Sequence, residues 1–240
     1  MLNILISLAC SALTAALMVR FVTPNQWIIM VVSAVVFAVV FILITRIVMK
    51  KVGALMEVAQ KDMMANRSDK AITELKSGMK YGPWQIYVKQ QINSQIGTIH
   101  YLKREFKEAT PFLEKGFVRN WVSTSMLAVT YMKKNKPTKM VETFGKAVSG
   151  NRKEPMVYAV YAFCMDRIGE RTKAIEILKK GIAKTSDERL QENMALLEAG
   201  KKMKMKGFGD MWYQFHLEKQ GAIIKKQTKA MTGRRKQVLR

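Results

Sequence analysis

The chain has 240 residues, of which 49% are hydrophobic, and its 41 Lys and Arg against 18 Asp and Glu give a net charge of +23. So apolar a chain is not a wholly disordered basic tail, and the length suits one domain with an appendage. The net charge alone is typical of a soluble nucleic-acid binder. The location of the charge argues against that class: residues 1–51 hold four basic residues and no acid, whereas residues 201–240 hold 12 basic residues against 2 acids.

The N-terminal region contains two uncharged runs, residues 1–19 and 21–45, separated by Arg20. A helix needs about 20 apolar residues to cross the hydrocarbon core of a bilayer. We therefore interpret residues 1–51 as a transmembrane helical hairpin with spans at about 2–20 and 27–48. The first run lacks the basic start of a signal peptide, and the apolar stretch before Cys10 is too short for a lipoprotein signal.

The charges that flank the two runs predict the orientation of the hairpin. The connecting loop carries only Arg20, whereas the second run is followed by Arg46, Lys50, Lys51 and Lys61. Basic residues favour the cytoplasmic side of a membrane. We expect an integral, multi-pass protein of the inner (cytoplasmic) membrane of a bacterium, with its C-terminal domain in the cytoplasm.

This region also contains regularly spaced small residues and Cys10, one of the two cysteines of the chain. Ser7, Ser11 and Ala15 recur every four residues, a spacing that lets two membrane helices approach closely, although such residues are also common in any apolar helix. Two thiols, Cys10 and Cys164, are too few for a disulfide framework or a metal cluster.

Residues 52–186 have helical periodicity and no strand signal, and a set of small and bulky residues recurs four times. The anchors of the four sets are Ala71, Ala109, Met140 and Ala174, spaced by 38, 31 and 34 residues. This pattern resembles the tetratricopeptide repeat, whose period is 34 residues. The resemblance implies an all-α fold class: two N-terminal transmembrane helices followed by an α-solenoid of antiparallel helical hairpins. Because Met140 and Pro137 depart from the pattern, we expect the third repeat to be distorted; the alternative is an ordinary helical bundle.

We predict capping helices over residues 187–220, which end the stack of hairpins. A glycine-flanked break at 207–209 precedes an aromatic segment, residues 210–217. We expect this segment to dock on the last hairpin because large apolar side chains are usually buried, with a partner-binding helix as the alternative. Residues 221–240 form a basic tail that we expect to be mobile.

Signals for catalysis and for metal or nucleotide binding are scarce. The sequence has two histidines, of which His100 falls in a predicted helix and His216 lies among aromatic residues, without a second histidine or a cysteine nearby. Motifs for zinc proteases, hydrolases and phosphate-binding loops do not occur. We expect no enzyme, no catalytic residue, no metal site and no cofactor.

A protein-binding surface is the remaining candidate site. The tetratricopeptide resemblance implies that the first helix of each hairpin lines a concave groove that holds partner segments. By position, this face comprises Gln95, Thr98, Tyr101, Met126, Val129, Lys133, Phe163 and Arg167. Its apolar and basic members suit acidic or amphipathic protein segments as partners; the alternative is a solvated or inter-helix face.

The basic tail provides a second candidate surface. Its cations include Lys225, Lys226, Lys229, Arg234, Arg235 and Lys236. Each cation near an anionic membrane gains about 1 kcal/mol, so the headgroups of anionic membrane lipids are the expected partner. Nucleic acid is the minority option because no aromatic residues are interleaved with these charges.

These features together predict a function. We expect a membrane-anchored scaffold or adaptor that binds and organises protein partners at the cytoplasmic face of the membrane. The alternatives are a structural subunit of a larger membrane protein complex and, third, a membrane tether for nucleic acid.

Overall fold

The computed structural model describes residues 1–22 and 24–218. These residues form eleven α-helices and two short 3₁₀ helices, without strands, which confirms the expected all-α fold class. They divide into two compact units, residues 1–100 with 107–117 and residues 101–106 with 118 onward. The boundary expected at residue 51 lies inside a continuous helix.

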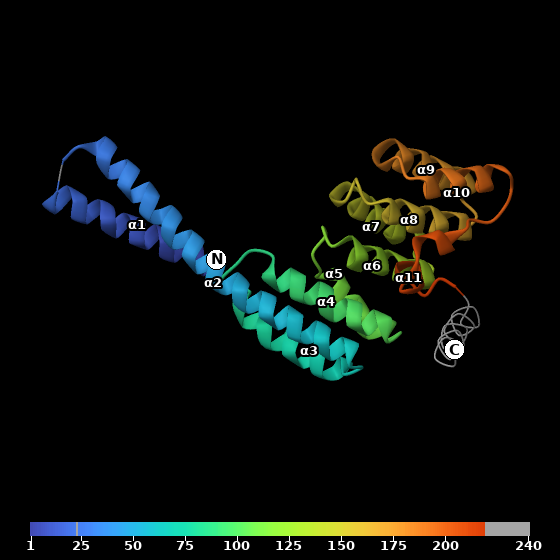
Figure 1. Cartoon of the computed structure of the whole chain (residues 1–240), viewed down its shortest axis with the longest axis horizontal. Helices are drawn as coiled ribbons and strands as arrows, with labels where there is room; N and C mark the ends of the chain where they lie inside the picture. The colour runs from blue at the N-terminus through green and yellow to red at the C-terminus, as the bar shows by residue number, and fades with distance from the viewer. Residues whose placement is uncertain (23, 219–240) are drawn as a thin grey trace, which may run out of the picture. The chain divides into compact units, whose positions relative to one another are not determined.

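The first unit begins with a pair of long apolar helices, α1 (Leu2–Phe21) and α2 (Gln26–Met64), which lie side by side (Figure 1). Asn25 caps α2, its side-chain oxygen accepting a hydrogen bond from the Trp27 N–H at 3.1 Å. Both helices are long and apolar enough to cross a membrane. α2 runs well past the span expected for it, to Met64, because Gly53 alone interrupts the sequence and breaks a helix only weakly.

Small and polar side chains face the inside of this hairpin. The Ser7 side chain is fully buried, and the Ser11 hydroxyl donates to the Ser33 carbonyl of the other helix at 2.9 Å. Asn3 Nδ2 donates to Thr45 Oγ1 at 3.2 Å, which pairs the start of α1 with the middle of α2. The predicted close approach through small residues is therefore present.

The rest of the first unit packs on the second half of α2. It comprises α3 (Ser68–Ser77), η1 (Gly78–Tyr81), α4 (Val88–Leu102) and α5 (Phe106–Glu114). Val52 and Ala59 of α2 share one apolar core with Leu75 of α3 and Ile92 and Ile96 of α4. The last residues of α4 and the first of α5 belong to the second unit.

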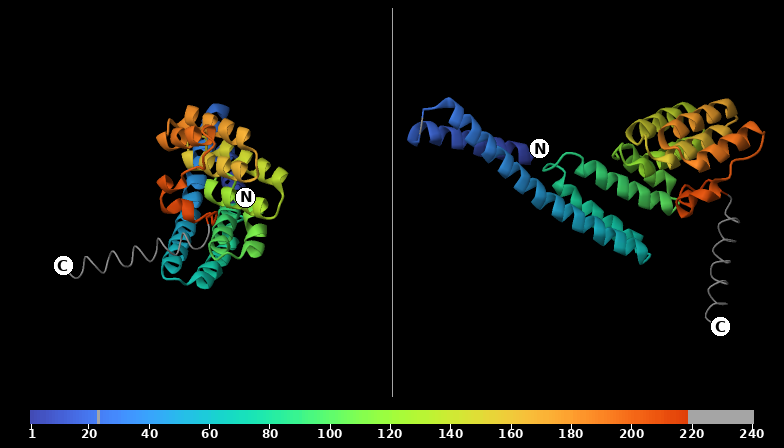
Figure 2. Two further views of the ribbon diagram at one scale, coloured as in Figure 1. Left: turned by 90° about the vertical axis from the view of Figure 1, so that its right-hand side faces the viewer. Right: turned by 45° about the horizontal axis from the view of Figure 1, so that its top comes forward.

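The second unit contains consecutive helix pairs joined by short turns. Its elements are α6 (Trp121–Lys133), α7 (Pro137–Gly150), α8 (Pro155–Arg167), α9 (Arg171–Thr185), α10 (Glu188–Glu198), η2 (Met205–Phe208) and α11 (Asp210–Tyr213). α6 packs against α7 and α8, α8 packs against α9, and α10 packs against both α8 and α9 (Figure 2). Asn120, Glu154 and Asp187 cap α6, α8 and α10 with their side chains, as polar residues do at helix N-termini.

One type of turn recurs along the chain, always with a residue in the left-handed region of the backbone. These residues are Asn66, Arg104, Asn135, Gly169 and Gly200. In four of the five turns the next N–H donates to the carbonyl five residues before it, a helix-ending pattern of the Schellman type. The bonds are Arg67 to Asp62, Lys136 to Tyr131, Glu170 to Met165 and Lys201 to Leu196, at 2.8–3.0 Å.

The recurring turn has the same spacing as the repeat in the sequence. Five residues after each turn residue stands a buried side chain: Ala71, Ala109, Met140, Ala174 and Met205. The expected distortion of the third repeat is wrong, because the α6–α7 and α8–α9 turns share their hydrogen bonds and Met140 is fully buried. The long side chain is accommodated without displacing the turn.

Candidate functional site

A C-terminal strap, residues 209–218, covers one face of the second unit. The strap begins at Gly209, whose φ of 69° allows the chain to turn back, and contains α11. Three of its side chains are almost completely buried: Trp212, Phe215 and Leu217. The surface beneath the strap is formed by the end of α4, the start of α5, α6 and α8.

Aromatic side chains hold the strap in place. The Trp212 ring meets Phe163 of α8 edge to face, with centroids 4.7 Å apart. The Phe215 ring stacks at 6.4 Å on Trp121 of α6. The expected docking on the last hairpin is therefore present through Phe163, and the strap also extends across α6.

Polar groups of the same face bind the backbone of the strap. The Tyr101 hydroxyl donates to the Phe215 carbonyl at 2.7 Å, and this bond is buried. Lys133 Nζ donates to the His216 carbonyl at 3.2 Å. Bonds to carbonyl groups depend little on the side chains of the bound segment, so this face is suited to hold an extended or turning peptide.

His216 lies in the same cluster. Its ring stacks on Tyr101 at 5.7 Å, and its Nε2 lies 3.2 Å from the Leu102 carbonyl. Desolvation and the positive charge of Arg104 lower the pKa of His216 from its ordinary value of 6.5, so the ring is neutral at pH 7. These contacts give His216 a packing role in the described structure.

The face beneath the strap is electropositive. Desolvation, together with the charges of Arg104 and Arg167, lowers the pKa of Lys133 to about 8. The Lys133 ammonium lies 4.1 Å above the Phe106 ring, and the Arg167 guanidinium lies 5.3 Å from the Phe163 ring. The charges of Arg104 and Arg167 contribute to this lowering, and the same charges would attract an incoming carboxylate.

The eight predicted groove residues differ in burial and in contact with the strap. Tyr101, Lys133 and Phe163 contact the strap directly. Met126 and Val129 are completely buried, so they are not available to a partner in this structure.

The other three differ in exposure. Arg167 is exposed beside Phe163, while Gln95 is exposed and Thr98 half-buried on α4, within the first unit. Of the predicted face, the strap therefore covers Tyr101, Lys133 and Phe163 in the second unit.

Sequence reasoning missed the role of Phe106 and Trp121, which line the covered face. The signal that could have found them is the aromatic density of residues 208–217, since a segment with so many rings needs a matching aromatic surface. The six cations expected to contact the membrane surface, between Lys225 and Lys236, lie outside the described residues.

The other candidate residues, His100 and Cys164, pack against neighbouring side chains or are buried. His100 stacks on Phe112 with centroids 5.7 Å apart. Cys164 is completely buried, and burial raises the pKa of its thiol well above the ordinary range. Within residues 1–22 and 24–218, no three histidine, cysteine or acidic side chains are grouped so that they could hold a metal ion.

Comparison with known proteins does not place the chain in a family. No protein-family model matches the chain, and no curated protein is significantly similar to it.

Proposed function

We propose that the protein is a membrane-anchored helical-repeat scaffold that holds a protein partner at the membrane surface. The observation that carries this proposal is the strap, a peptide segment already bound on the first-helix face by aromatic contacts and by bonds to its carbonyl groups. A face that binds one such segment offers the same contacts to another.

The apolar hairpin supports the anchor. Many of its large apolar side chains point away from the unit, among them Leu5, Leu13, Val35 and Ile42, each 56–66% exposed. Lipid would cover such a surface, because soluble proteins rarely expose large contiguous apolar patches. The cations that follow Thr45 favour a cytoplasmic body in a bacterial-type inner membrane.

The recurring turn supports a tetratricopeptide-like stack of antiparallel hairpins. Successive helix pairs cannot bury their apolar faces alone, and stacking provides a continuous core. The first helices of such a stack share one face, which here is the covered one.

The partner in this proposal displaces the strap. A tethered segment acts at an effective concentration in the millimolar range, so a partner must bind the face more tightly than the strap does. A partner with acidic side chains gains from Lys133 and Arg167. The strap contacts Lys133 only through a carbonyl group, and Arg167 lies over Phe163 of its own helix, α8. An acidic amphipathic segment is thus the expected partner.

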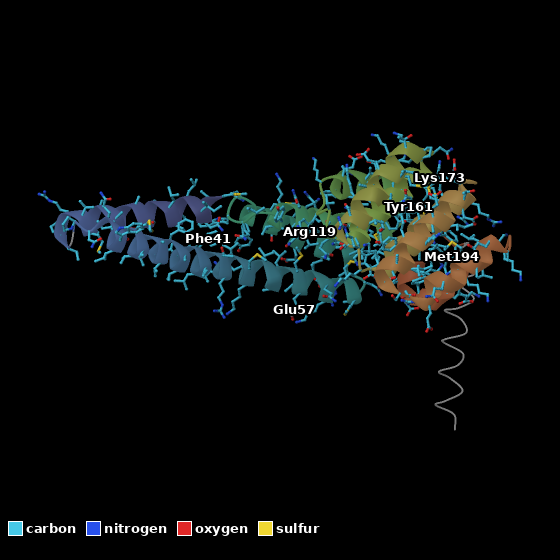
Figure 3. All side chains as sticks on the ribbon, turned by 90° about the horizontal axis from the view of Figure 1, so that it is seen from above. Phe41, Glu57, Arg119, Tyr161, Lys173 and Met194 are labelled. Carbon is cyan, nitrogen blue, oxygen red and sulfur yellow. The ribbon has the colours of Figure 1, made fainter. Side chains whose placement is uncertain are left out.

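A photo-cross-linking residue at Arg167, in membranes of producing cells, tests this function. We expect a specific partner to be cross-linked at position 167, with a severalfold higher yield when Trp212→Ala loosens the strap. The matched control is Lys173 of α9, where the same residue should give no such gain (Figure 3). Equal yields with and without Trp212→Ala would contradict displacement.

The same experiment separates the scaffold from a structural subunit of a membrane complex. A subunit would be cross-linked mainly through its exposed hairpin, for example at Val35, in a stable stoichiometric complex. Those cross-links, without any at Arg167, would favour the subunit.

A further inference from the structure

An open cavity of about 520 Å³ lies in the first unit, beside the start of α1. The segment before α4, the first turns of α4 and Lys115 line it, and its polar side chains are those of Gln85, Lys89, Gln90, Asn93 and Lys115. Among the described residues that line the cavity there is no carboxylate, so neither lysine has a counter-charge in the wall. Two ammonium groups and three amides form a site for an anion with several oxygens.

The cavity lies at the depth where the apolar run of α2 ends. Asn3 Nδ2 donates to Thr45 Oγ1 at 3.2 Å and to Gln85 Oε1 at 2.6 Å, so the cavity wall is level with Thr45. The Leu2 N–H donates to the Pro83 carbonyl at 2.9 Å, which fixes the same segment to α1. The uncharged run ends at Thr45 and the next residue is Arg46. In a bilayer, this is the level of the headgroups.

The mouth of the cavity carries exposed apolar and aromatic side chains. Ile86 is 40% exposed and Tyr87 is 53% exposed. Tyr87 has a φ of 69°, an unfavourable backbone conformation for a bulky residue, and its ring packs on Phe117 at 5.1 Å. An aromatic ring in such a position is typical of the membrane interface, where its apolar body contacts lipid and its hydroxyl contacts water.

We propose that this cavity binds the phosphate of one anionic phospholipid, with Lys89 and Lys115 as its cationic ligands. The amide groups of Gln85 and Gln90 are donors for the remaining oxygens, and Ile86 contacts the glycerol and acyl chains. The volume fits a headgroup, since cavities for small ligands measure about 300–1,000 Å³. This inference rests on the membrane placement proposed above.

The cavity is independent of the basic tail, the anionic-lipid surface expected from the sequence. Its lining residues belong to the first unit. Lys89 lies in the first turn of α4, and Lys115 directly follows α5. A variant that removes them leaves every charge of residues 219–240 in place, so the two lipid-binding surfaces can be separated by mutation.

The test uses the full chain reconstituted into phosphatidylcholine bilayers with a small fraction of spin-labelled phosphatidylglycerol or phosphatidylcholine. The fraction of immobilised label gives the preference for phosphatidylglycerol. Lys89→Gln with Lys115→Gln should lower that preference about tenfold, since each cation near a membrane contributes an electrostatic attraction to anionic lipid. The matched control, Lys179→Gln with Lys184→Gln, removes two positive charges from exposed positions of α9. It should leave the preference for phosphatidylglycerol unchanged.

The outcomes are distinguishable. If both double variants keep the preference of the unmodified protein, or lose it equally, the cavity is not the site. Millimolar inorganic phosphate should not release the labelled lipid, because its acyl chains stay in the bilayer; release would identify a soluble phosphate as the ligand and overturn the lipid assignment. A chain that does not enter the bilayer contradicts the proposed anchor, whereas one that enters without a preference contradicts this inference alone.

Discussion

Phe215→Ala should release the strap and lower the stability of the second unit by about 3 kcal/mol, as is usual when a fully buried phenylalanine is truncated. The ring is completely buried and stacks on Trp121, and its own carbonyl accepts the buried bond from Tyr101. Because the strap can detach, the loss is limited to the free energy of docking. Hydrogen exchange should show strap amides exchanging faster by two orders of magnitude, the factor that this free energy corresponds to.

Met211→Ala is the matched control for this prediction. Met211 belongs to the same strap but is 37% exposed, so its truncation should change the exchange rates little. Equal effects of the two variants would mean that burial of the Phe215 ring has no special part in holding the strap, and no effect of Phe215→Ala would contradict the docked strap.

Gly181→Ala should destabilise the second unit by about 2 kcal/mol, although alanine is the better helix former. A Cβ at this position would lie 2.7 Å from Tyr158 Cγ and 2.9 Å from Leu190 Cδ1. Tyr158 cannot move away easily, since its hydroxyl donates to the Arg152 carbonyl at 3.0 Å. The close approach of α8 and α9 therefore requires glycine. Urea denaturation of the detergent-solubilised chain, followed by circular dichroism, measures the change.

Gly145 provides the control because it lies in α7 with no atom within 4 Å of a Cβ built on it. Gly145→Ala should stabilise the chain by about 0.5–1 kcal/mol through its helix propensity alone. Gains of similar size from both substitutions would show that α8 and α9 do not pack as closely as described.

The sequence predicts the helices and their small contact residues because both follow from local rules. The anchors Ala71, Ala109 and Ala174 are all fully buried. Two helices can pack closely only where a small side chain lies between them. Small residues that recur along a sequence therefore indicate where its helices pack against each other.

Met140 shows where this reasoning fails. A long side chain at a crossing position predicts a distorted repeat, yet the α6–α7 turn has the geometry of the α8–α9 turn. Methionine is unbranched and flexible, so it fills an irregular gap that a pattern of residue sizes cannot describe.

The face beneath the strap could be predicted from the sequence only in part. Tyr101, Lys133 and Phe163 are placed on one face by helical position, but their occupant lies about 50 to 110 residues further along the chain, from Trp212 to His216. Such long-range contacts follow from the shape of the whole unit. The aromatic content of residues 210–217 indicated burial on the last hairpin, without indicating the contacts with Tyr101 of α4 and Trp121 of α6.

The proposed scaffold depends on the orientation of the hairpin, because its partner is expected at the cytoplasmic face of the membrane. Cysteine labelling with a membrane-impermeant maleimide in intact cells measures this orientation, with Gln26→Cys at the start of α2, which leaves the Asn25 cap in place, and Lys173→Cys in the body. Position 26 should be labelled in intact cells, and position 173 only after the cells are made permeable. The unmodified chain, in which Cys164 is buried and Cys10 lies within the hairpin, gives the background labelling. Labelling of position 173 in intact cells, or of both positions only after permeabilisation, would contradict the proposed orientation.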